Sequence, residues 1–259
     1  MTRVRIVGAG RAGTSFAAAL AAVGFDVQPL IQRGEDLSNA AKDVDVVLIA
    51  TPDAAIGVVA AAITPQPNTV LLHLSGAQTL ASLAKHPRRG SIHPLLPLPN
   101  AEIGAERLLS GATFAVAGDP VARELAEALG GRVVDVADDD RATYHAAACV
   151  AANHVVGLLG QVERLAHGIG LDLDCFLGLT RAALADVSTL GPQRALTGPA
   201  VRGDWATLER HLLAIPEEER PAYDAGVSLA LQLATGLPGL GSAVVVEPAS
   251  AVVAVDAAS

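Results

Sequence analysis

The sequence RVRIVGAGRAG at residues 3–13 joins an apolar strand pattern to a helix pattern through three glycines. The apolar run ends at Val7, and the alanine-rich segment after Gly13 has the composition of a helix. In the spacing G-x-G-x-x-G, the first glycine permits a tight turn, the second lets the backbone approach a pyrophosphate, and the third lets the helix pack on the strand. We therefore predict a dinucleotide-binding turn whose contacts are Gly8, Gly10, Arg11, Ala12 and Gly13. The alternative is a glycine-rich turn without a ligand.

The end of the second predicted strand indicates which dinucleotide binds. An NAD site usually places Asp or Glu about twenty residues after the glycines, where the carboxylate holds the ribose hydroxyls. Here Gln32 and Arg33 occupy that place, and Glu35 and Asp36 come slightly later. A guanidinium pairs with a 2′-phosphate and stacks on adenine. We therefore predict NADP rather than NAD, with Gln32 and Arg33 as contacts. An exposed loop arginine without a ligand is the alternative.

Strand and helix patterns alternate through the first half of the chain. Continuous apolar runs, typical of strands covered on both faces, occur at residues 4–10, 25–33, 45–50, 69–76, 90–94, 112–118 and 132–136. After residue 138 only helix patterns follow, at residues 138–170, 171–191, 204–215 and 217–236. We predict an α/β fold: a Rossmann-type doubly wound parallel sheet in residues 1–138, followed by an all-α domain in residues 139–246. Residues 247–259 are expected to form a poorly ordered tail.

Three further predicted strands end in small polar clusters. Because ligands of such sheets bind at the carboxyl ends of the strands, these clusters are candidates for the same cleft. Thr51 and Pro52 are predicted to line the cofactor channel, and Asp53 is expected to cap the next helix. Ser75 and Gly76 are predicted at the nicotinamide end, with an ordinary turn as the alternative.

His93 precedes a proline-rich loop, HPLLPLP, which is expected to cover the site. A catalytic role and a buried structural role are both open for this histidine.

The long predicted helix carries the second informative cluster, YHAAACVAANH at residues 144–154. On a helix, Asn153 falls on one face, made mostly of small residues, with Ala146, Cys149, Val150, Gly157 and Gly160, and His145 lies on an adjacent face. The functional interpretation is a substrate that Asn153 hydrogen-bonds and to which His145 donates a proton. The alternative is close packing of another helix or of a dimer partner, with the amide satisfied internally.

A later turn, TGPAVRGD, is a candidate anion site. Thr197, Gly198 and Arg202 are predicted to bind substrate, with Arg202 gripping a carboxylate. The alternative is a helix connection in which the arginine binds a carbonyl group. Asp204 is expected to cap the following helix.

Composition narrows the classes of function. The formal net charge of −9 argues against general nucleic-acid binding. Cys149 and Cys175 are interpreted as reduced core thiols of a cytoplasmic protein. The start lacks the pattern of a signal peptide, and the most apolar segment is interrupted at Pro52 and Asp53, so no membrane span is expected. No metal-ligand spacing occurs among the seven histidines.

The motifs RIVGAGRAG, ATPD, HLSGA, SIHPL, YHAAACVAANH and GPAVRGD, in this order, resemble a bacterial family of uncharacterised proteins. That family joins a Rossmann-like domain to a helical domain of unknown function and is similar to the 6-phosphogluconate dehydrogenase-like superfamily, with pyrroline-5-carboxylate reductase and ketopantoate reductase as relatives. The resemblance implies NADP binding and a homodimer formed through the helices. It also implies hydride transfer between nicotinamide and a C=O or C=N group.

One feature departs from that pattern. Many such relatives use a lysine on the first long helix of the second domain, whereas this chain has only Lys42 and Lys85, both in the first. Lysine-dependent chemistry of the ketopantoate type therefore cannot be carried over, and an imine substrate or an acid role for His145 fits better. With the motifs above, the sequence favours an NADP-dependent oxidoreductase of a small, carboxylate-bearing substrate, with His145, Asn153 and His93 as catalytic candidates. The rival interpretations are an NADP-binding sensor or scaffold without turnover, and an empty fold used for dimer assembly.

Overall fold

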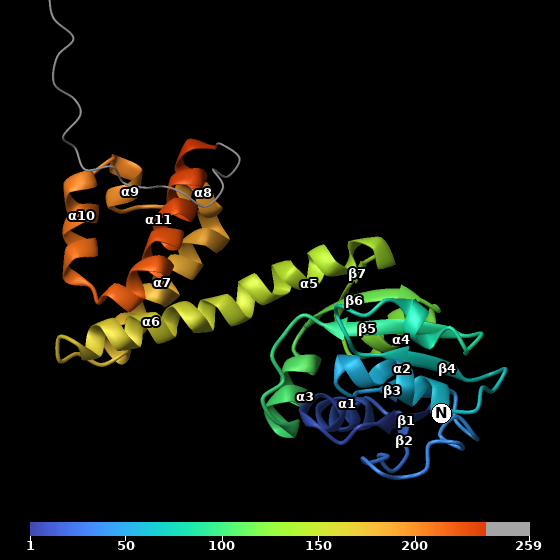
Figure 1. Ribbon diagram of the computed structural model, residues 1–259. Coiled ribbons are helices and arrows are strands. Elements are labelled where there is room, and N and C mark those ends of the chain that lie inside the picture. Colours follow the sequence, from blue (N-terminus) through green and yellow to red (C-terminus); the bar gives the residue numbers. More distant parts are fainter. Residues whose placement is uncertain (237–259) are drawn as a thin grey trace, which may run out of the picture. The chain divides into compact units, whose positions relative to one another are not determined.

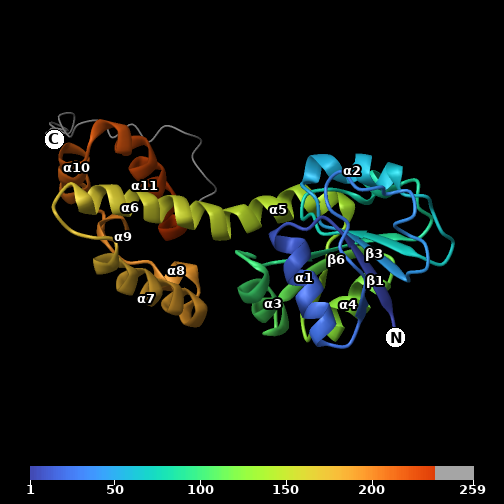
Figure 2. The same ribbon diagram turned by 90° about the horizontal axis from the view of Figure 1, so that it is seen from below.

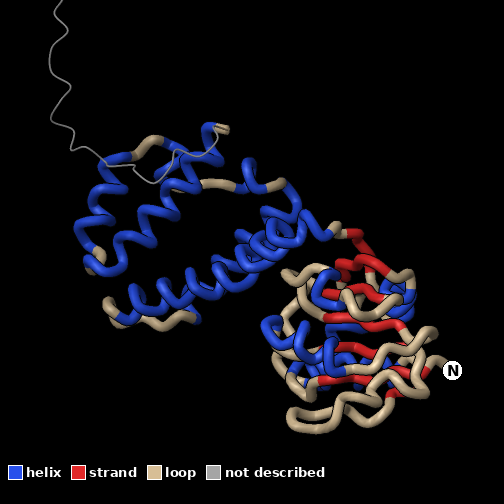
Figure 3. The backbone as a smooth tube through the Cα atoms, turned by 45° about the vertical axis from the view of Figure 1, so that its right-hand side comes forward, coloured by secondary structure: helices blue, strands red, loops and turns tan. Residues whose placement is uncertain are grey.

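A computed structural model describes residues 1–236 of the chain. It divides into two compact units, unit 1 from Met1 to Val155 and unit 2 from Val156 onward. Strands occur only in unit 1 among the described residues, and unit 2 is built of helices (Figure 3). The predicted fold class, a Rossmann-type sheet followed by an all-α part, is confirmed. The tail predicted at residues 247–259 lies outside the described residues.

In the described chain the strands form one seven-stranded sheet with the order β2-β1-β3-β4-β5-β6-β7. All neighbouring pairs are parallel except β5–β6, which is antiparallel. The strands are β1 (Arg3–Val7), β2 (Asp26–Val27), β3 (Val46–Ile49), β4 (Val70–His73), β5 (Arg89–Pro94), β6 (Thr113–Gly118) and β7 (Arg132–Asp135).

Helices cover both faces of this sheet (Figures 1 and 2). Alternate residues of the central strands, such as Ile6 and Leu48, pack against α1 (Arg11–Ala22), α3 (Ala101–Leu109) and α4 (Val121–Ala128). The opposite face, with Val47 and Ile49, packs against α2 (Asp53–Ala62) and the short helix η1 (Leu80–Leu83). These two apolar layers explain why the strands read as uninterrupted apolar runs.

The second strand is much shorter than the predicted stretch of residues 25–33. Only Asp26–Val27 pairs as a strand, and Val7 forms an isolated bridge with Ile31. Pro29 lies between these two pairings, and proline has no N–H to donate to a neighbouring strand. Helix α3 is absent from the sequence-based prediction.

A continuous helical stretch runs from Asp138 to His167. It comprises η2 (Asp138–Asp140), α5 (Arg141–Cys149), a π-helical segment η3 (Val150–His154) and α6 (Val155–His167). The predicted domain boundary at residue 138 marks the start of this stretch, whereas the compact units divide at Val155. The start of the helical stretch belongs to unit 1 because Arg141 is buried there and donates hydrogen bonds to Ser75 and Ser91.

Unit 2 continues from α6 through helices separated by short loops. They are α7 (Asp174–Leu190), α8 (Pro192–Ala195), α9 (Pro199–Arg202), α10 (Trp205–Ala214), η4 (Glu217–Glu219) and α11 (Arg220–Thr235). Asp204 caps α10 as predicted, because its carboxylate accepts a hydrogen bond from the N–H of Thr207 at 3.2 Å. Within unit 2, Gln161 donates to the carbonyl of Glu219 at 2.9 Å, which ties α6 to the start of α11.

Candidate functional site

The glycine turn between β1 and α1 is shaped for close backbone approach. Gly8 has φ +112°, and a Cβ built on it would lie 2.7 Å from the carbonyl oxygen of Ala50. A Cβ on Gly13 would lie 1.9 Å from the carbonyl oxygen of Gly8. Gly10 differs, because no described atom lies within 4 Å of a Cβ built there. Gly8 and Gly13 are therefore needed by the fold itself, whereas the open side at Gly10 leaves space for a ligand.

The loop after β2 contains the residues predicted to select the dinucleotide. The carboxylate of Glu35 accepts a hydrogen bond from the N–H of Gln32 at 2.5 Å, and that of Asp36 accepts from Ser38. Both acidic side chains are thus used within the loop. Arg33 is exposed and has no hydrogen bond or ion pair among the described residues. Its guanidinium remains available for an anion.

The end of β3 adds an unsatisfied polar atom beside the glycine turn. The Oγ1 atom of Thr51 is buried and has no hydrogen-bond partner among the described residues, and the N–H of Thr51 lies 3.3 Å from a Cβ built on Gly8. Pro52 is the residue before α2 and is exposed. Because β1 and β3 are parallel neighbours, Gly8 and Thr51 meet at the carboxyl edge of the sheet. These residues fit a dinucleotide, since they offer an open backbone turn and an unused hydroxyl.

Ser75, after β4, uses its hydroxyl inside the protein. Its Oγ donates to a carboxylate oxygen of Asp53 at 2.7 Å and accepts from the N–H groups of Ala77 and Gln78. A serine hydroxyl has one donor and two acceptor positions, so this one is saturated. The expectation that Asp53 caps α2 is wrong, because Asp53 is the first helical residue and its carboxylate binds Ser75 instead.

Gly76 lies between two histidine rings. A Cβ built on Gly76 would lie 2.8 Å from Cδ2 of His145 and 2.9 Å from Cε1 of His93. The two rings have centroids 6.1 Å apart. Nδ1 of His93 also forms a 2.7 Å hydrogen bond with the hydroxyl of Tyr144, in an edge-to-face arrangement of the two rings. The structure thus brings His93 and His145 together, as the sequence analysis proposed, and adds Tyr144.

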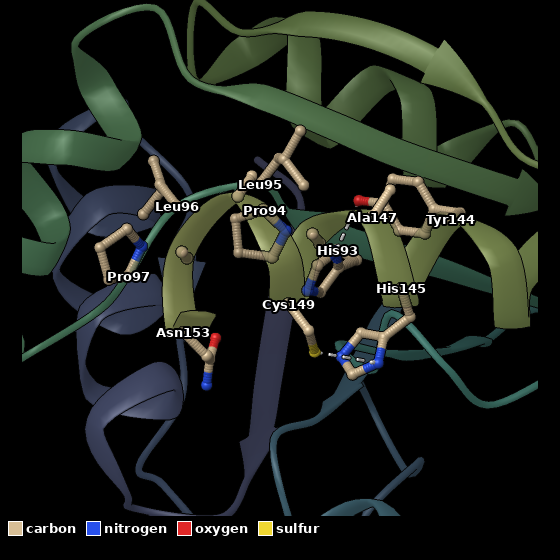
Figure 4. A pocket seen from close by; sticks show the side chains of 13 residues that line it. His93, Pro94, Leu95, Leu96, Pro97, Tyr144, His145, Ala147, Cys149 and Asn153 are labelled. Atoms are coloured by element: carbon tan, nitrogen blue, oxygen red, sulfur yellow. Dashed lines mark hydrogen bonds between the residues drawn. The ribbon is translucent and has the colours of Figure 1, made fainter. Parts of the chain in front are cut away.

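A pocket of about 600 Å³ opens beside this cluster in unit 1 (Figure 4). One wall is the loop Pro94–Pro97 after β5, and the other is the helical stretch from Tyr144 to Asn153. His145 lies 3.8 Å (Nδ1 to Sγ) from Cys149. Asn153 is exposed, has no hydrogen bond to a described residue and lines the pocket away from Tyr144 in this view. The proline-rich loop therefore forms part of the candidate site.

The π-helical segment Val150–His154 changes the predicted helix face. A π turn carries one residue more than an α-helical repeat and so shifts the side chains that follow it. The predicted stripe through Ala146, Cys149, Asn153 and Gly157 therefore does not continue as one straight line. No described atom lies within 4 Å of a Cβ built on Gly157, so the described chain does not supply the close packing expected there.

Arg141 is a site residue that the sequence analysis missed. Its side chain is fully buried, and its guanidinium donates to the carbonyl of Ser75 at 3.3 Å and to the hydroxyl of Ser91. Asp138 pairs with its Nε at 3.2 Å and also accepts from the N–H of Leu80. Arg141 thus connects the loop after β4 and strand β5 to the helix that carries Tyr144 and His145. The only sequence signal was its place in the first turn of the long helix.

Burial keeps His73, the last residue of β4, and His93, near the end of β5, uncharged near neutral pH. His73 is completely buried, and neither ring nitrogen has a hydrogen-bond partner among the described residues. Burial, followed by the charge of Arg141, lowers the pKa of His73 to about 4. Burial, followed by the charges of His145 and Arg141, lowers the pKa of His93 to about 4. Burial also raises the pKa of Tyr144, so its hydroxyl keeps its proton near neutral pH.

These shifts predict acid sensitivity of the fold. Between pH 6.5 and 4 the unfolded chain protonates His73 whereas the folded chain does not, so the free energy of unfolding falls as the pH falls through this window. The lowered pKa of fully buried His73 corresponds to roughly 3 kcal/mol. Urea denaturation at pH 7 and at pH 4.5 measures the loss. His73→Leu should reduce this pH dependence, whereas His154→Gln on the exposed helix surface should not. Equal pH dependence in wild type and His73→Leu would contradict a neutral buried His73.

The predicted anion site of Thr197, Gly198 and Arg202 lies in unit 2. Gly198 has φ +100° and precedes the four-residue helix α9, in which Arg202 is the last residue. Thr197 and Arg202 are exposed. Hydrogen bonds from Thr207 are the main cause that lowers the pKa of Asp204, and the charge of Arg202 lowers it further. These residues do not line the pocket of unit 1.

Within residues 1–236 no group of three or more His, Cys, Asp or Glu side chains is placed to hold a metal ion. Both cysteines are free. Cys149 lines the pocket, and Cys175 is exposed, so the expectation of a core position is wrong for Cys175.

The stretch Asp138–His167 is long and apolar enough to cross a membrane by length and composition. However, the buried Arg141 in the first part of this stretch donates hydrogen bonds to Ser75 and Ser91 of unit 1. Near the other end of the stretch, Arg164 forms an ion pair with Glu219. We therefore interpret it as a helix of the folded protein.

Comparison with known proteins identifies a matching domain and solved structures of similar fold. Residues 112–229 match the model of DUF2520, a domain of unknown function. No curated protein sequence matches the chain. Among solved structures, a candidate NADP oxidoreductase from Bacteroides fragilis is 19% identical with a TM-score of 0.73, covering 91% of this chain and 98% of its own. A reductive aminase from Aspergillus terreus, in complex with NADPH4, cyclohexanone and allyl amine, is 17% identical with a TM-score of 0.67, covering 90% and 94%.

A pyrroline carboxylate reductase from Plasmodium falciparum with NADP bound is 12% identical with a TM-score of 0.57, covering 90% of this chain and 98% of that one. At these identities the likeness establishes a shared fold. Together with the domain match, it confirms the arrangement that the sequence motifs indicate. The chain therefore has the Rossmann-like fold of these solved structures, and its residues 112–229 match the DUF2520 domain.

Proposed function

We propose that this protein is an NADP-dependent oxidoreductase that reduces a C=O or C=N group of a small molecule. One observation carries the proposal: the open glycine turn and the His93–Tyr144 pair lie at the carboxyl edge of one sheet. The strands β1, β3, β4 and β5 are parallel. Gly10, Thr51 and Gly76 follow the carboxyl ends of the first three strands, and His93 is the last residue but one of β5. Ligands of doubly wound sheets bind along that edge. Solved relatives whose names include NADP and reductase have the same fold.

The cofactor contacts proposed from the sequence are those of the turn and its surroundings. Backbone N–H groups at the start of α1, next to Gly10, would hold the pyrophosphate, because a helix N-terminus favours an anion. Arg33 would pair with the 2′-phosphate, and Gln32, Thr51 and Pro52 would line the channel. Ser75 would act through its backbone, because its hydroxyl is saturated. When bound, NADPH supplies a hydride.

Proton delivery is assigned to the His93–Tyr144 pair. His93 is neutral at pH 7 because of its low pKa, so it is a poor acid. Tyr144 keeps its proton and is held by His93 at 2.7 Å while lining the pocket. Tyr144 would donate its proton to the reacting oxygen or nitrogen, and His93 would orient the hydroxyl. His145 and Asn153, the other catalytic candidates, line the same pocket and would hold the substrate.

The cheapest test of this proposal combines cofactor binding with turnover. We expect NADPH to raise the Tm more than NADH does at equal concentration, and NADPH to be oxidised with some member of a panel of ketones, keto acids and imines. Binding without oxidation across the panel would favour the rival function, an NADP-binding sensor or scaffold. No response to either dinucleotide would favour an empty fold.

The preference for NADP is tested at Arg33. Arg33→Ala should weaken NADPH binding roughly tenfold and leave NADH binding unchanged, because only NADPH offers a phosphate for a charge-assisted hydrogen bond. Isothermal titration with both dinucleotides measures this. Arg132→Ala, which removes an equal charge at the amino end of β7, is the matched control. An equal loss for both dinucleotides would mean that Arg33 does not contact the 2′-phosphate.

We also propose that unit 2 forms a homodimer with a second copy. None of the residues of α7 is buried, and Leu179 and Leu213 are 72% and 74% exposed. Exposed apolar patches mark protein–protein interfaces, and Leu184, Val187 and Leu190 of α7 are exposed as well. Sedimentation equilibrium should give twice the mass of 26.2 kDa. A monomer at micromolar concentration would contradict the homodimer. We also propose a cytoplasmic location.

A further inference from the structure

The pocket of unit 1 is lined almost entirely by apolar and uncharged groups. Eight of its thirteen lining residues are alanine, leucine or proline: Pro94, Leu95, Leu96, Pro97, Ala147, Ala148, Ala151 and Ala152. The loop contributes the larger side chains, and the helix contributes the alanines (Figure 4). A volume of about 600 Å³ is within the range of small-molecule sites.

The remaining lining residues are polar but provide no permanent cation. They are His93, Tyr144, His145, Cys149 and Asn153, and no lysine or arginine occurs among the described residues of the lining. The arginine on the same helix, Arg141, is buried with its guanidinium bound to Asp138, Ser75 and Ser91. It is therefore already paired.

A carboxylate would lose free energy in such a pocket. Removing an anion from water is unfavourable unless a cation or several donors replace the water. Removing an apolar group from water is favourable in proportion to the area buried. The formal net charge of −9 adds a weak general repulsion of anions. The lining thus favours an uncharged group over an anion.

We propose that this pocket binds an uncharged, apolar part of the substrate, so that the substrates are neutral aliphatic or alicyclic ketones or imines. This assignment rests on the proposed function and narrows it. It differs from the carboxylate-bearing substrate that the turn with Arg202 suggested. Asn153 and Tyr144 supply the polar contacts at the two ends of the lining, and the alanine face between them contacts hydrocarbon.

The test uses two probes that differ only at one end, heptan-2-one and 6-oxoheptanoate. Both are titrated into the NADPH-loaded protein, with binding followed by saturation-transfer NMR and turnover followed by NADPH absorbance. We expect heptan-2-one to bind at least about tenfold more tightly. Leu95→Lys, at a lining position that is 44% exposed, should reverse the preference by introducing a cation. Leu109→Lys, on α3 outside the pocket and 37% exposed, adds the same charge and should not.

The outcomes separate this inference from the proposed function. If heptan-2-one binds preferentially and Leu95→Lys reverses the preference, but NADPH is never oxidised, the pocket assignment stands and the oxidoreductase fails. If NADPH is oxidised with 6-oxoheptanoate in preference to heptan-2-one, the assignment is overturned and the oxidoreductase stands. Loss of that preference in Arg202→Ala would then return the carboxylate to Arg202. If neither probe binds, the assignment of the pocket is overturned.

Discussion

Gly10→Ala is expected to weaken NADPH binding roughly 100-fold while leaving the Tm of the cofactor-free protein unchanged. The backbone at Gly10 is extended, with φ −77° and ψ −174°, which any residue adopts. No described atom lies within 4 Å of the added Cβ, so the fold tolerates it. A pyrophosphate that approaches this backbone closely does not. Isothermal titration and a thermal melt of the same sample measure the two effects.

The control for this prediction is another glycine with a similar tolerance. Gly57 lies in α2, and its nearest neighbour to an added Cβ is the carbonyl of Ser82 at 3.9 Å. Gly57→Ala should change neither the Tm by much nor the affinity for NADPH. Gly13→Ala is not a useful probe, because its Cβ would meet the carbonyl of Gly8 at 1.9 Å and disrupt the turn itself. NADPH affinity of Gly10→Ala equal to that of wild type would remove the turn from the cofactor site.

Tyr144→Phe is expected to lower kcat by about 100-fold to 10,000-fold, the usual contribution of a positioned acid. The substitution removes only the hydroxyl that His93 holds, so the affinity for NADPH should remain and KM should change little. The pKa of Tyr144 is raised by burial, so the wild-type rate should not decline between pH 7 and 9. Steady-state kinetics with any substrate found in the panel measure these effects.

Unit 2 provides a matched control for the tyrosine. Tyr223 forms the same kind of pair, with its hydroxyl 2.6 Å from Nδ1 of His211 and the rings edge to face. Tyr223→Phe breaks a histidine–tyrosine bond of equal geometry outside the pocket and should leave kcat intact. If Tyr144→Phe retains wild-type turnover, the proton comes from another group, and His145→Gln becomes the decisive variant.

Most of the fold could be predicted because its signals are local. The run through Val7 and the glycines after it specify a strand, a turn and a helix by steric requirements of neighbouring residues. The antiparallel pairing of β6 with β5 could not be predicted, since the direction of a strand depends on the path of the whole connection before it. Its partner residues, such as Ile92 and Val116, have the same apolar character in either direction.

The candidate site was only partly accessible from the sequence. Gly76, His93 and His145 are 17 and 52 residues apart along the chain, yet each was singled out because it followed a strand or lay on the long helix. Arg141 was missed because a buried guanidinium is an exception to the general exposure of arginine. Its partners are Ser75, in the loop after β4, and Ser91, within β5, and only the three-dimensional structure brings them together.

The hydrogen bonds from Arg141 to Ser75, in the loop after β4, and to Ser91, within β5, also fix the position of Tyr144. Tyr144 follows Arg141 by three residues, so its hydroxyl is anchored through the same turn that the strands grip. Both members of the His93–Tyr144 bond are therefore positioned by the same sheet, His93 by its place in β5 and Tyr144 through the arginine that precedes it. The geometry of this pair is set within unit 1 alone.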